Sequence, residues 1–414
     1  MASSGWVEER GKGRWRLSVN CGANEDGSRK IIRETVKAKN RDAALKKLGL
    51  FIKKIEQGEY IEPTKQTFKV FVEKWLKTHA EKSLAPKTLY RYHQLLDSRI
   101  IPALGQIKLD KIKPIHLIDF YSNLTEDGIR EDGRSGGLSE RTILHHHRLI
   151  SSILQDAVEW QIIPSNPASK VPPPKVHMKH SKFYDEEEIK ALMSAVETEA
   201  TKHKALIYLA VFCGLRCGEI MGLEWKDIDF EKNLLMVRQA GQYIPGQGAF
   251  TKEPKNESSR RMISMPLRVL NVLSQHKAEQ DEVAEKLEDL WHESERVFTT
   301  RDGKAAHPEW PSQWFPKFLR RKNLPPLPFH GLRHTAATIM ISQGADVKNL
   351  SSRLGHANTS TTLNIYSHAL KSIDRDIAEK TDAYIEKMFS REGQADLQEQ
   401  SVMDEQKPAL TLVK

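Results

Sequence analysis

The chain has 414 residues, of which 39% are hydrophobic and 29% are charged, an ordinary composition that excludes collagen-like, disulfide-scaffold and wholly disordered proteins. At roughly 150 residues per domain, this length predicts about three domains. Lys and Arg number 64 against 55 Asp and Glu, so the net charge is +9 and the pI is near 9.2, which favours a polyanionic partner.

The cysteines and the apolar runs narrow the class further. Three cysteines, Cys21, Cys213 and Cys217, are too few for a disulfide framework or a four-thiolate metal site, and they fit a reducing cytosol. The longest apolar run, residues 205–215, is well short of the roughly 20 residues of a bilayer-spanning helix. The N-terminus lacks the pattern of a signal peptide. We therefore expect a soluble intracellular protein with no membrane partner.

Residues 1–60 predict a small unit of short strands followed by one helix. Residues 14–20 alternate in polarity, residues 24–27 form a turn-like sequence, and a helical pattern runs from about Arg41 to Gln57. The segment holds 14 Lys or Arg and 8 Asp or Glu, a net charge of +6, which is two thirds of the surplus of the whole chain. A DNA-binding module, with Arg14 and Arg16 as candidate contacts, is favoured over a merely solvated small domain.

Residues 64–170 have a helical pattern. One predicted helix starts at Pro86 and keeps apolar residues at helical spacing until Pro102, and another begins at the N-cap residue Ser139. Basic side chains near these helix starts could reach phosphates together with the free backbone donors, although ordinary surface charge explains them equally well. These candidates are Lys87, Arg91 and Arg141.

Residues 171–174 are the clearest linker, because consecutive prolines favour a stiff extended form. Asp185 and Glu188 form a capping-box-like pair at the start of the next domain. From 180 to about 390 helical patterns dominate, interrupted by strand-like pieces at 234–239 and 261–265, and residues 391–414 form a polar tail. The predicted fold class is mainly α (α+β): a small sheet-plus-helix domain, a helical domain, and a mostly α domain with a small antiparallel sheet.

The last domain carries an arginine where a plain core helix would not have one. Arg216 follows an apolar run and should enter the edge of the core. A buried guanidinium must find an acid or bind an anionic ligand, because desolvating it alone is costly. Glu219, three residues on, is a ready structural partner, so both interpretations stay open.

A second candidate group is His330, Arg333 and His334. His330 and Arg333 share a face once a helix starts. His330 and His334 also have the spacing of a zinc pair, but Gly331 stands where a His-Glu-x-x-His metallohydrolase has its glutamate base, which weakens the metal interpretation. The adjacent histidines 145–147 lie about 100° apart on a helix, a poor geometry for chelation.

The third candidate segment ends in a tyrosine. Gly355 is typical of the residue that ends a helix, and Thr359 can cap a following helix that carries Tyr366. A lone tyrosine on an amphipathic helix is usually a core residue. The order of the motifs along the chain changes this interpretation. In chain order, the motifs are Arg216, a basic strand pair, His330-x-x-Arg333, Leu354-Gly-His356, and Tyr366 ten residues later.

This ordered set resembles the catalytic signature of the tyrosine recombinases, the phage integrase family. The resemblance covers residues 180–390. The preceding layout is similar to the family's helical, SAM-like core-binding domain (64–170) and, in integrases of the lambda and conjugative-transposon kind, to a small arm-binding domain (1–60). The resemblance implies a site-specific recombinase that integrates or excises a phage or other mobile element. It would cut and rejoin DNA through a 3′-phosphotyrosyl intermediate, with no metal ion, ATP or other cofactor.

The resemblance also implies roles for the two arginines and the tyrosine. Arg216 and Arg333 would each grip nonbridging oxygens of the scissile phosphate with paired donors and stabilise the charge of the transition state. Tyr366 would attack the phosphorus. A hydroxyl with an ordinary pKa near 10 needs a proton acceptor, and His330 is the candidate.

The remaining catalytic candidates are a lysine and a second histidine. The family uses a lysine in a turn between two strands to protonate the departing 5′ oxygen. Lys255 aligns best with that lysine, and Lys252 is the alternative. His356 would hydrogen-bond a phosphate oxygen and help to position the tyrosine.

The expected partners are double-stranded DNA at core-type and arm-type sites, three further copies in a homotetramer on DNA, and an accessory DNA-bending or directionality protein. The expected location is the bacterial cytoplasm, on the nucleoid. Three other functions compete. A type IB topoisomerase shares the tyrosine chemistry, but the separate basic N-terminal unit argues against it. The intact set of catalytic side chains argues against a silent DNA-binding regulator. A metal-dependent nuclease predicts sensitivity to chelators and no covalent adduct.

Overall fold

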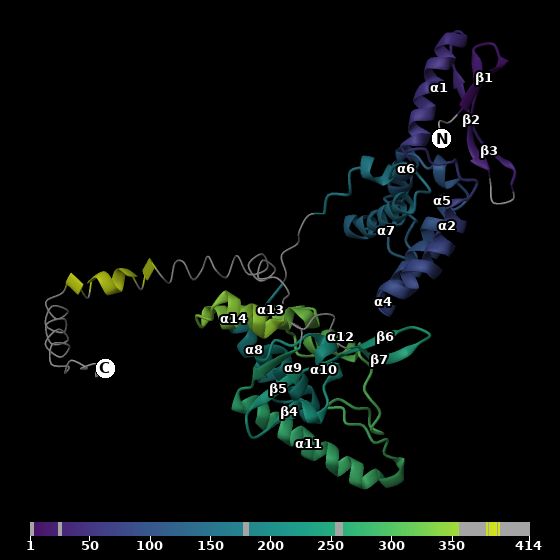
Figure 1. The fold of residues 1–414 in the computed structure, drawn as a ribbon. Helices are drawn as coiled ribbons and strands as arrows, with labels where there is room; N and C mark the ends of the chain where they lie inside the picture. The colour runs from purple at the N-terminus through teal and green to yellow at the C-terminus, as the bar shows by residue number, and fades with distance from the viewer. Residues whose placement is uncertain are drawn as a thin grey trace, which may run out of the picture. The chain divides into compact units, whose positions relative to one another are not determined.

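The computed structural model describes residues 4–23, 27–176, 182–252, 260–355, 378–379, 381–386 and 388–389. The chain divides into two compact units, Met1–Met178 and Lys179–Lys414 (Figure 1). Within the described ranges, no helix is long and apolar enough to cross a membrane.

The first unit begins with a three-stranded antiparallel sheet covered on one face by a helix. The strands β1 (Ser4–Gly11), β2 (Arg14–Ala23) and β3 (Arg29–Lys37) pair in that order, and α1 (Arg41–Glu56) follows, capped by the Asn40 side chain. Alternation along β2 buries Leu17 and Val19 against Leu48 and Phe51 of α1. These elements confirm the predicted strand at 14–20 and the predicted helix. Residues 24–26 of the predicted turn lie outside the described residues.

The rest of this unit is helical and has its own core. The longer helices are α2 (Phe68–Trp75), α4 (Pro86–Leu95), α6 (Pro114–Asn123) and α7 (Glu140–Glu159). Shorter pieces are π turns at Leu76–Ala80 and Leu96–Ile100, the helices α3 (Glu81–Ser83) and α5 (Ile101–Leu104), and 3-10 turns at Leu109–Lys111 and Pro167–Lys170. Large side chains fill the core, among them Trp75, Phe68, Ile100, Ile150 and Leu154.

Two of the predicted helix starts are confirmed, and one predicted end is wrong. Pro86 occupies the first turn of α4, and the Ser139 side chain caps α7 by accepting from the Thr142 N–H. The helix that starts at Pro86 does not stop at Pro102, however, but continues to Leu104. The π turn at Leu96–Ile100 changes the hydrogen-bond register just before Pro102. The chain therefore passes the proline, which has no N–H to donate, without ending the helix.

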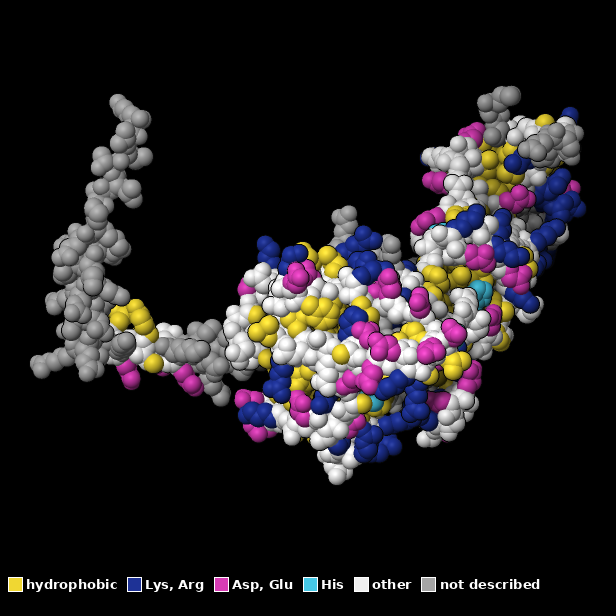
Figure 2. Space-filling model, turned by 90° about the horizontal axis from the view of Figure 1, so that it is seen from below, with side chains coloured by type: hydrophobic (Ala, Val, Ile, Leu, Met, Phe, Trp, Pro, Cys, Tyr) yellow, Lys and Arg dark blue, Asp and Glu magenta, His cyan; other side chains and the backbone are white. Residues whose placement is uncertain are grey.

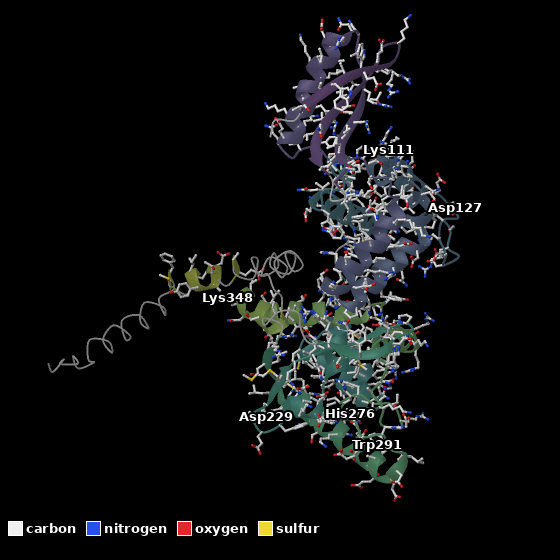
Figure 3. All side chains as sticks on the ribbon, turned by 45° about the vertical axis from the view of Figure 1, so that its right-hand side comes forward. Lys111, Asp127, Asp229, His276, Trp291 and Lys348 are labelled. Carbon is white, nitrogen blue, oxygen red and sulfur yellow. The ribbon has the colours of Figure 1, made fainter. Side chains whose placement is uncertain are left out.

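The second unit is built around α9 (Thr201–Phe212), whose residues 205–211 are all hydrophobic and buried. It packs against α11 (Leu267–Leu287) and α13 (Phe329–Ser342). His276 of α11 lies in this packing and bonds the Val297 carbonyl at 2.8 Å (Figure 3). The other helices are α8 (Glu186–Val196), α10 (Cys217–Gly222), α12 (Trp310–Arg321) and α14 (Val347–Leu354). Short 3-10 turns lie at Trp225–Asp227 and Glu288–Leu290.

Small antiparallel sheets complete this unit. The strands β4 (Ile228–Asp229), β5 (Leu234–Val237) and β8 (Arg261–Ser264) pair in that order, which confirms both predicted strand-like pieces. The hairpin of β6 (Ala240–Ile244) and β7 (Gly248–Lys252) was not predicted. One of its glycines, Gly241 in β6, packs closely on α10, because a Cβ added there would lie 3.1 Å from the Met221 carbonyl oxygen.

Other boundaries of the second unit are also as predicted. Asp185 and Glu188 form a reciprocal capping box at the start of α8, with bonds of 2.9 and 2.8 Å. Gly355, at φ 66°, ends α14 in the left-handed conformation. Residues 381–386 are helical. The predicted polar tail, 391–414, lies outside the described residues.

Candidate active site

Arg216 lies at the N-terminus of α10, where the sequence places it at the edge of the core. Its Nη1 donates to Glu219 Oε1 at 2.7 Å, and its backbone N–H donates to Glu219 Oε2 at 2.9 Å. Its Nη2 donates to the Gly355 carbonyl, 2.8 Å away and 139 residues further along the chain. The side chain remains 37% exposed. The ion pair with Glu219 is therefore real, and it leaves the guanidinium accessible to an anion.

Glu219 is shared between two arginines. It is 6% exposed, and both of its oxygens also accept from Arg261, at 3.1 Å from Nη1 and 2.8 Å from Nη2. Burial alone would raise the pKa of Glu219. The hydrogen bonds and charge of Arg261, together with Arg216, overcome this effect and lower its pKa to about 2. The carboxylate therefore stays ionised throughout the physiological pH range.

Arg333 is held by backbone carbonyls at two glycine-containing turns. It is 2% exposed, and its Nη1 and Nη2 donate to the Gly214 and Leu354 carbonyls at 2.7 and 2.5 Å. Gly214 has a φ of 65°, and a Cβ there would lie 2.7 Å from Leu354 Cδ2. A glycine is thus required both by the backbone conformation and by the close approach of α14. The two turns fix the plane of the guanidinium.

His330 starts α13, and its surroundings disfavour its charged form. Its ring packs edge-on against His334, with centroids 4.9 Å apart. Partial desolvation lowers the pKa of His330, and the positive charges of Arg333 and Arg216 lower it further. Burial also lowers the pKa of His334, to about 4, with smaller contributions from His330 and Arg333. Both imidazoles are therefore neutral at pH 7, and His330 can accept a proton.

The structure brings together three of the predicted catalytic side chains. Arg216 and Arg333 meet at the C-terminal end of α14, where the Gly355 and Leu354 carbonyls accept from them, and His330 lies close enough to both arginines for their charges to lower its pKa. The other three candidates, Lys255, His356 and Tyr366, lie outside the described residues. His356 directly follows Gly355, so the backbone that leads to it is fixed by Arg216. The alternative lysine, Lys252, is the last residue of β7 and is half-buried.

The candidate DNA contacts lie on the surface of the first unit. Lys87 and Arg91 lie on α4 and Arg141 on α7, and all three are exposed. Arg14 and Arg16 lie on β2 and share the sheet face opposite α1. Figure 2 shows that Lys and Arg side chains alternate with acidic ones over much of the visible surface. Surface charge alone therefore does not distinguish these five candidates from the other basic residues on the surface.

The sequence analysis missed Arg261 and the carbonyl groups that hold the arginines. Arg261 is the first residue of β8 and is buried on the same face as Ile263. A charged residue in register with a buried strand residue could have indicated a polar partner in the core. The carbonyl acceptors of Gly214, Leu354 and Gly355 carry no such signal, because every residue has one.

No metal site is apparent in the part of the chain that the structure describes. No group of three or more His, Cys, Asp or Glu residues there could hold a metal ion. His146 bonds the Thr142 carbonyl and His147 bonds the Tyr121 hydroxyl, at 2.8 and 3.2 Å. These two adjacent histidines therefore serve packing within the helical core.

Comparison with known families decides between the competing interpretations. Residues 182–372 match the model of the phage integrase family, and residues 67–125 match that of the phage integrase N-terminal SAM-like domain. Together these matches span more than half of the chain. The chain belongs to the tyrosine recombinases of the phage integrase family. The protein is thus a site-specific DNA strand-transferring enzyme, an integrase of the kind that mobile elements carry.

Individual relatives agree with this assignment. A tyrosine recombinase XerC-like protein of Caldanaerobacter subterraneus subsp. tengcongensis is 29% identical over 381 residues, which cover 87% of this recombinase and 94% of the relative. The ICEBs1 integrase of Bacillus subtilis is 28% identical over 274 residues, covering 66% and 72% of the two chains. The Tn1549 transposon integrase, solved in complex with transposon right end DNA, has the same fold with a TM-score of 0.62. It is 22% identical, and the match covers 76% of this chain and 99% of that one.

Proposed function

We propose that this recombinase cleaves DNA at a scissile phosphate held between Arg216 and Arg333. The observation that carries the proposal is that both guanidinium groups bond the end of α14 and that His330 lies within reach of the charges of both. Guanidinium groups stay charged at any relevant pH and present fixed paired donors that match nonbridging phosphate oxygens. Such groups stabilise the extra negative charge that develops on the phosphate in the transition state.

The remaining catalytic candidates carry out the nucleophilic attack and the proton transfers. Tyr366 attacks the phosphorus and forms a 3′-phosphotyrosine, and the P–O bond to the 5′ oxygen breaks. His330, neutral at pH 7, accepts the phenolic proton, and Lys255 donates a proton to the departing 5′ oxygen. His356 hydrogen-bonds a phosphate oxygen. A 5′-hydroxyl from a second DNA then attacks the phosphotyrosine, so that the covalent bond energy is retained and no ATP is consumed.

The first unit supplies two kinds of DNA contact in this proposal. The sheet face opposite α1 has a hollow of about 430 Å³ lined by basic, aromatic and polar side chains: Trp6, Glu8, Arg10, Arg16, Ser18, Arg33 and Thr35. Its position on the basic segment 1–60 supports binding of arm-type sites, to which Arg14 and Arg16 contribute. Lys87, Arg91 and Arg141, exposed near the starts of α4 and α7, contact phosphates of the core site.

Recombination between two DNA duplexes cuts and rejoins four strands, two in each duplex. A homotetramer on DNA therefore follows from the reaction, with one protomer for each exchanged strand. An accessory DNA-bending or directionality protein completes the proposed assembly, since an arm site and a core site bound by one chain require the intervening DNA to bend.

The test is the trapping of the covalent intermediate. The full chain is incubated with duplexes that carry candidate crossover sequences and a nick beside the expected cleavage position, so that the released fragment diffuses away. We expect an SDS-resistant protein–DNA adduct with the wild type and with the control Tyr243→Phe, formed equally with or without a chelator. We expect none with Tyr366→Phe. An adduct formed by Tyr366→Phe would overturn the assignment of the nucleophile.

A second measurement tests the arm-type contact. Deletion of residues 1–60 should abolish binding to one class of DNA site and leave binding to the core site. Binding to both should weaken steeply with salt because bound Lys and Arg release counterions from the phosphates. Unchanged binding to every site after the deletion would refute this part of the proposal.

A further inference from the structure

Arg261 is a buried charged group at the site, yet no part of the proposed reaction uses it. Its side chain is 6% exposed, and it begins β8, directly after the segment 253–260 that carries Lys255. A guanidinium in such a place is costly to desolvate unless its donors are satisfied. The groups that accept hydrogen bonds from Arg261 therefore indicate its structural role.

Those partners belong to two other segments of the site. Nη1 and Nη2 of Arg261 hold both oxygens of Glu219, which in turn accepts from the side chain and the backbone of Arg216. Nε donates to the Arg353 carbonyl at 2.7 Å, in the last turn of α14. One planar group thus links the start of β8 to the N-terminus of α10 and to the C-terminus of α14.

The link between β8 and α14 is reciprocal. Arg353 of α14 donates from its Nη2 to the carbonyl of Ser264, the last residue of β8, at 2.9 Å. The two arginines therefore tie both ends of the strand to the end of the helix. The contact with Gly355 is also close, since a Cβ there would lie 2.8 Å from Arg261 Nη1. The backbone that leads to His356 is consequently held against Arg261.

From this geometry we infer that Arg261 is a positioning residue, which sets the orientation of Arg216 through Glu219 and fixes the point where the Lys255 segment ends and the point where the His356 segment begins. This inference rests on the proposed function of Arg216. Arg261 itself does not touch the phosphate. It acts because a free Glu219 carboxylate could rotate, and the Arg216 guanidinium would rotate with it away from the orientation that matches a phosphate.

Lysine cannot replace Arg261 in this role. A guanidinium presents donors in a rigid plane, so it can grip both oxygens of Glu219 with two nitrogens and the Arg353 carbonyl with the third. An ammonium keeps the charge but lacks this fixed geometry. The Arg261→Lys variant therefore keeps the positive charge at position 261 and removes only the fixed orientation of its donors. The matched control is Arg268→Lys, in the same unit, because Arg268 is also paired with a glutamate, Glu197, at 3.0 Å but is 74% exposed.

The experiment measures two quantities for the full-length variants, at a temperature where circular dichroism shows each to be folded. These are the Kd for a core-site duplex and the rate of adduct formation on the nicked substrate at saturating DNA. We expect Arg261→Lys to lower the rate roughly 10- to 100-fold, as small misplacements of reacting groups do, and to change the Kd by less than about threefold. Arg268→Lys should match the wild type in both.

A double variant tests whether Arg261 acts through Arg216. Arg216→Lys alone should slow adduct formation, and adding Arg261→Lys should slow it no further, because residues that act as a unit are not additive. Multiplicative effects, or a wild-type rate for Arg261→Lys, would overturn the inference. Should Arg261→Lys not fold, Glu219→Asp, which withdraws the shared carboxylate by one methylene, is expected to give the same loss, and a wild-type rate would overturn the inference. Failure of the wild type to form an adduct would instead refute the proposed chemistry.

Discussion

Glu219→Gln should destabilise the second unit by an amount that depends on pH. Burial alone would raise the pKa of Glu219. The hydrogen bonds and charges of Arg261 and Arg216 outweigh burial and lower this pKa from 4.5 to about 2 on folding. A shift of roughly 2.5 units corresponds to about 3 kcal/mol at pH 7. Because the folded-state pKa is depressed, this stability is present above pH 4.5 and is lost as the pH falls towards 2. At pH 3, about 2 kcal/mol of it should be gone.

The assay is urea unfolding of the full chain, with the transition of the second unit followed at a series of pH values from 7 to 3. Glutamine keeps the size of the side chain but cannot ionise, and it leaves the buried Arg261 without its counter-charge. The difference in unfolding free energy between wild type and Glu219→Gln should be at least about 3 kcal/mol at pH 7 and shrink as the pH falls. Glu282→Gln, which removes an exposed pair with Lys286 at 2.6 Å, serves as the control and should change stability little. A difference for Glu219→Gln that stays constant from pH 7 to 3 would refute the reasoning.

Two further predictions concern α13. Gly331→Ala should destabilise the unit by about 1–3 kcal/mol, because the added Cβ would lie 2.5 Å from Leu327 Cδ1; a thermal midpoint equal to that of the wild type would contradict the packing. Desolvation and the charges of Arg333 and Arg216 lower the pKa of His330 from its ordinary value near 6.5, so the base is mostly neutral at pH 6.5. The adduct-formation rate should therefore decline on acidification only at a pH below 6.5, and a half-maximal rate above pH 6.5 would argue against His330 as the base.

Much of the fold could be predicted because local signals agreed with the final packing. Asp185 with Glu188, Ser139, Pro86 and Gly355 each mark a helix boundary through chemistry confined to a few residues. The hairpin β6–β7 could not be predicted, because Gly241 serves a close approach to α10 that appears only in three dimensions. The continuation of the helix past Pro102 depended likewise on a π turn that no residue pattern indicates.

The candidate site divides in the same way. Arg216 with Glu219 was predictable from a three-residue spacing, and His330 with Arg333 from another. The attachment of the two arginines to α14 was not, since it joins side chains to backbone carbonyls that are distant in sequence, 139 residues apart for Arg216 and Gly355 and 21 for Arg333 and Leu354. Arg261 shows why contacts between distant segments are hard to predict from sequence. Its role depends on three acceptor atoms of two residues, Glu219 and Arg353, that lie in distant segments, and no sequence pattern identifies these contacts.

The charges at the site can now be counted. In the part of the site that the structure describes, Arg216, Arg261 and Arg333 contribute three positive charges, and Glu219 contributes one negative charge that persists because its pKa is about 2. The net charge of +2 suits a phosphodiester, which carries one negative charge and accumulates more in the transition state. Guanidinium groups stay charged in proteins, and Glu219 stays ionised, so this charge does not change near neutral pH. Any pH dependence of cleavage near neutrality must therefore come from the groups that move protons, which are His330, the lysine and the tyrosine of the proposed mechanism.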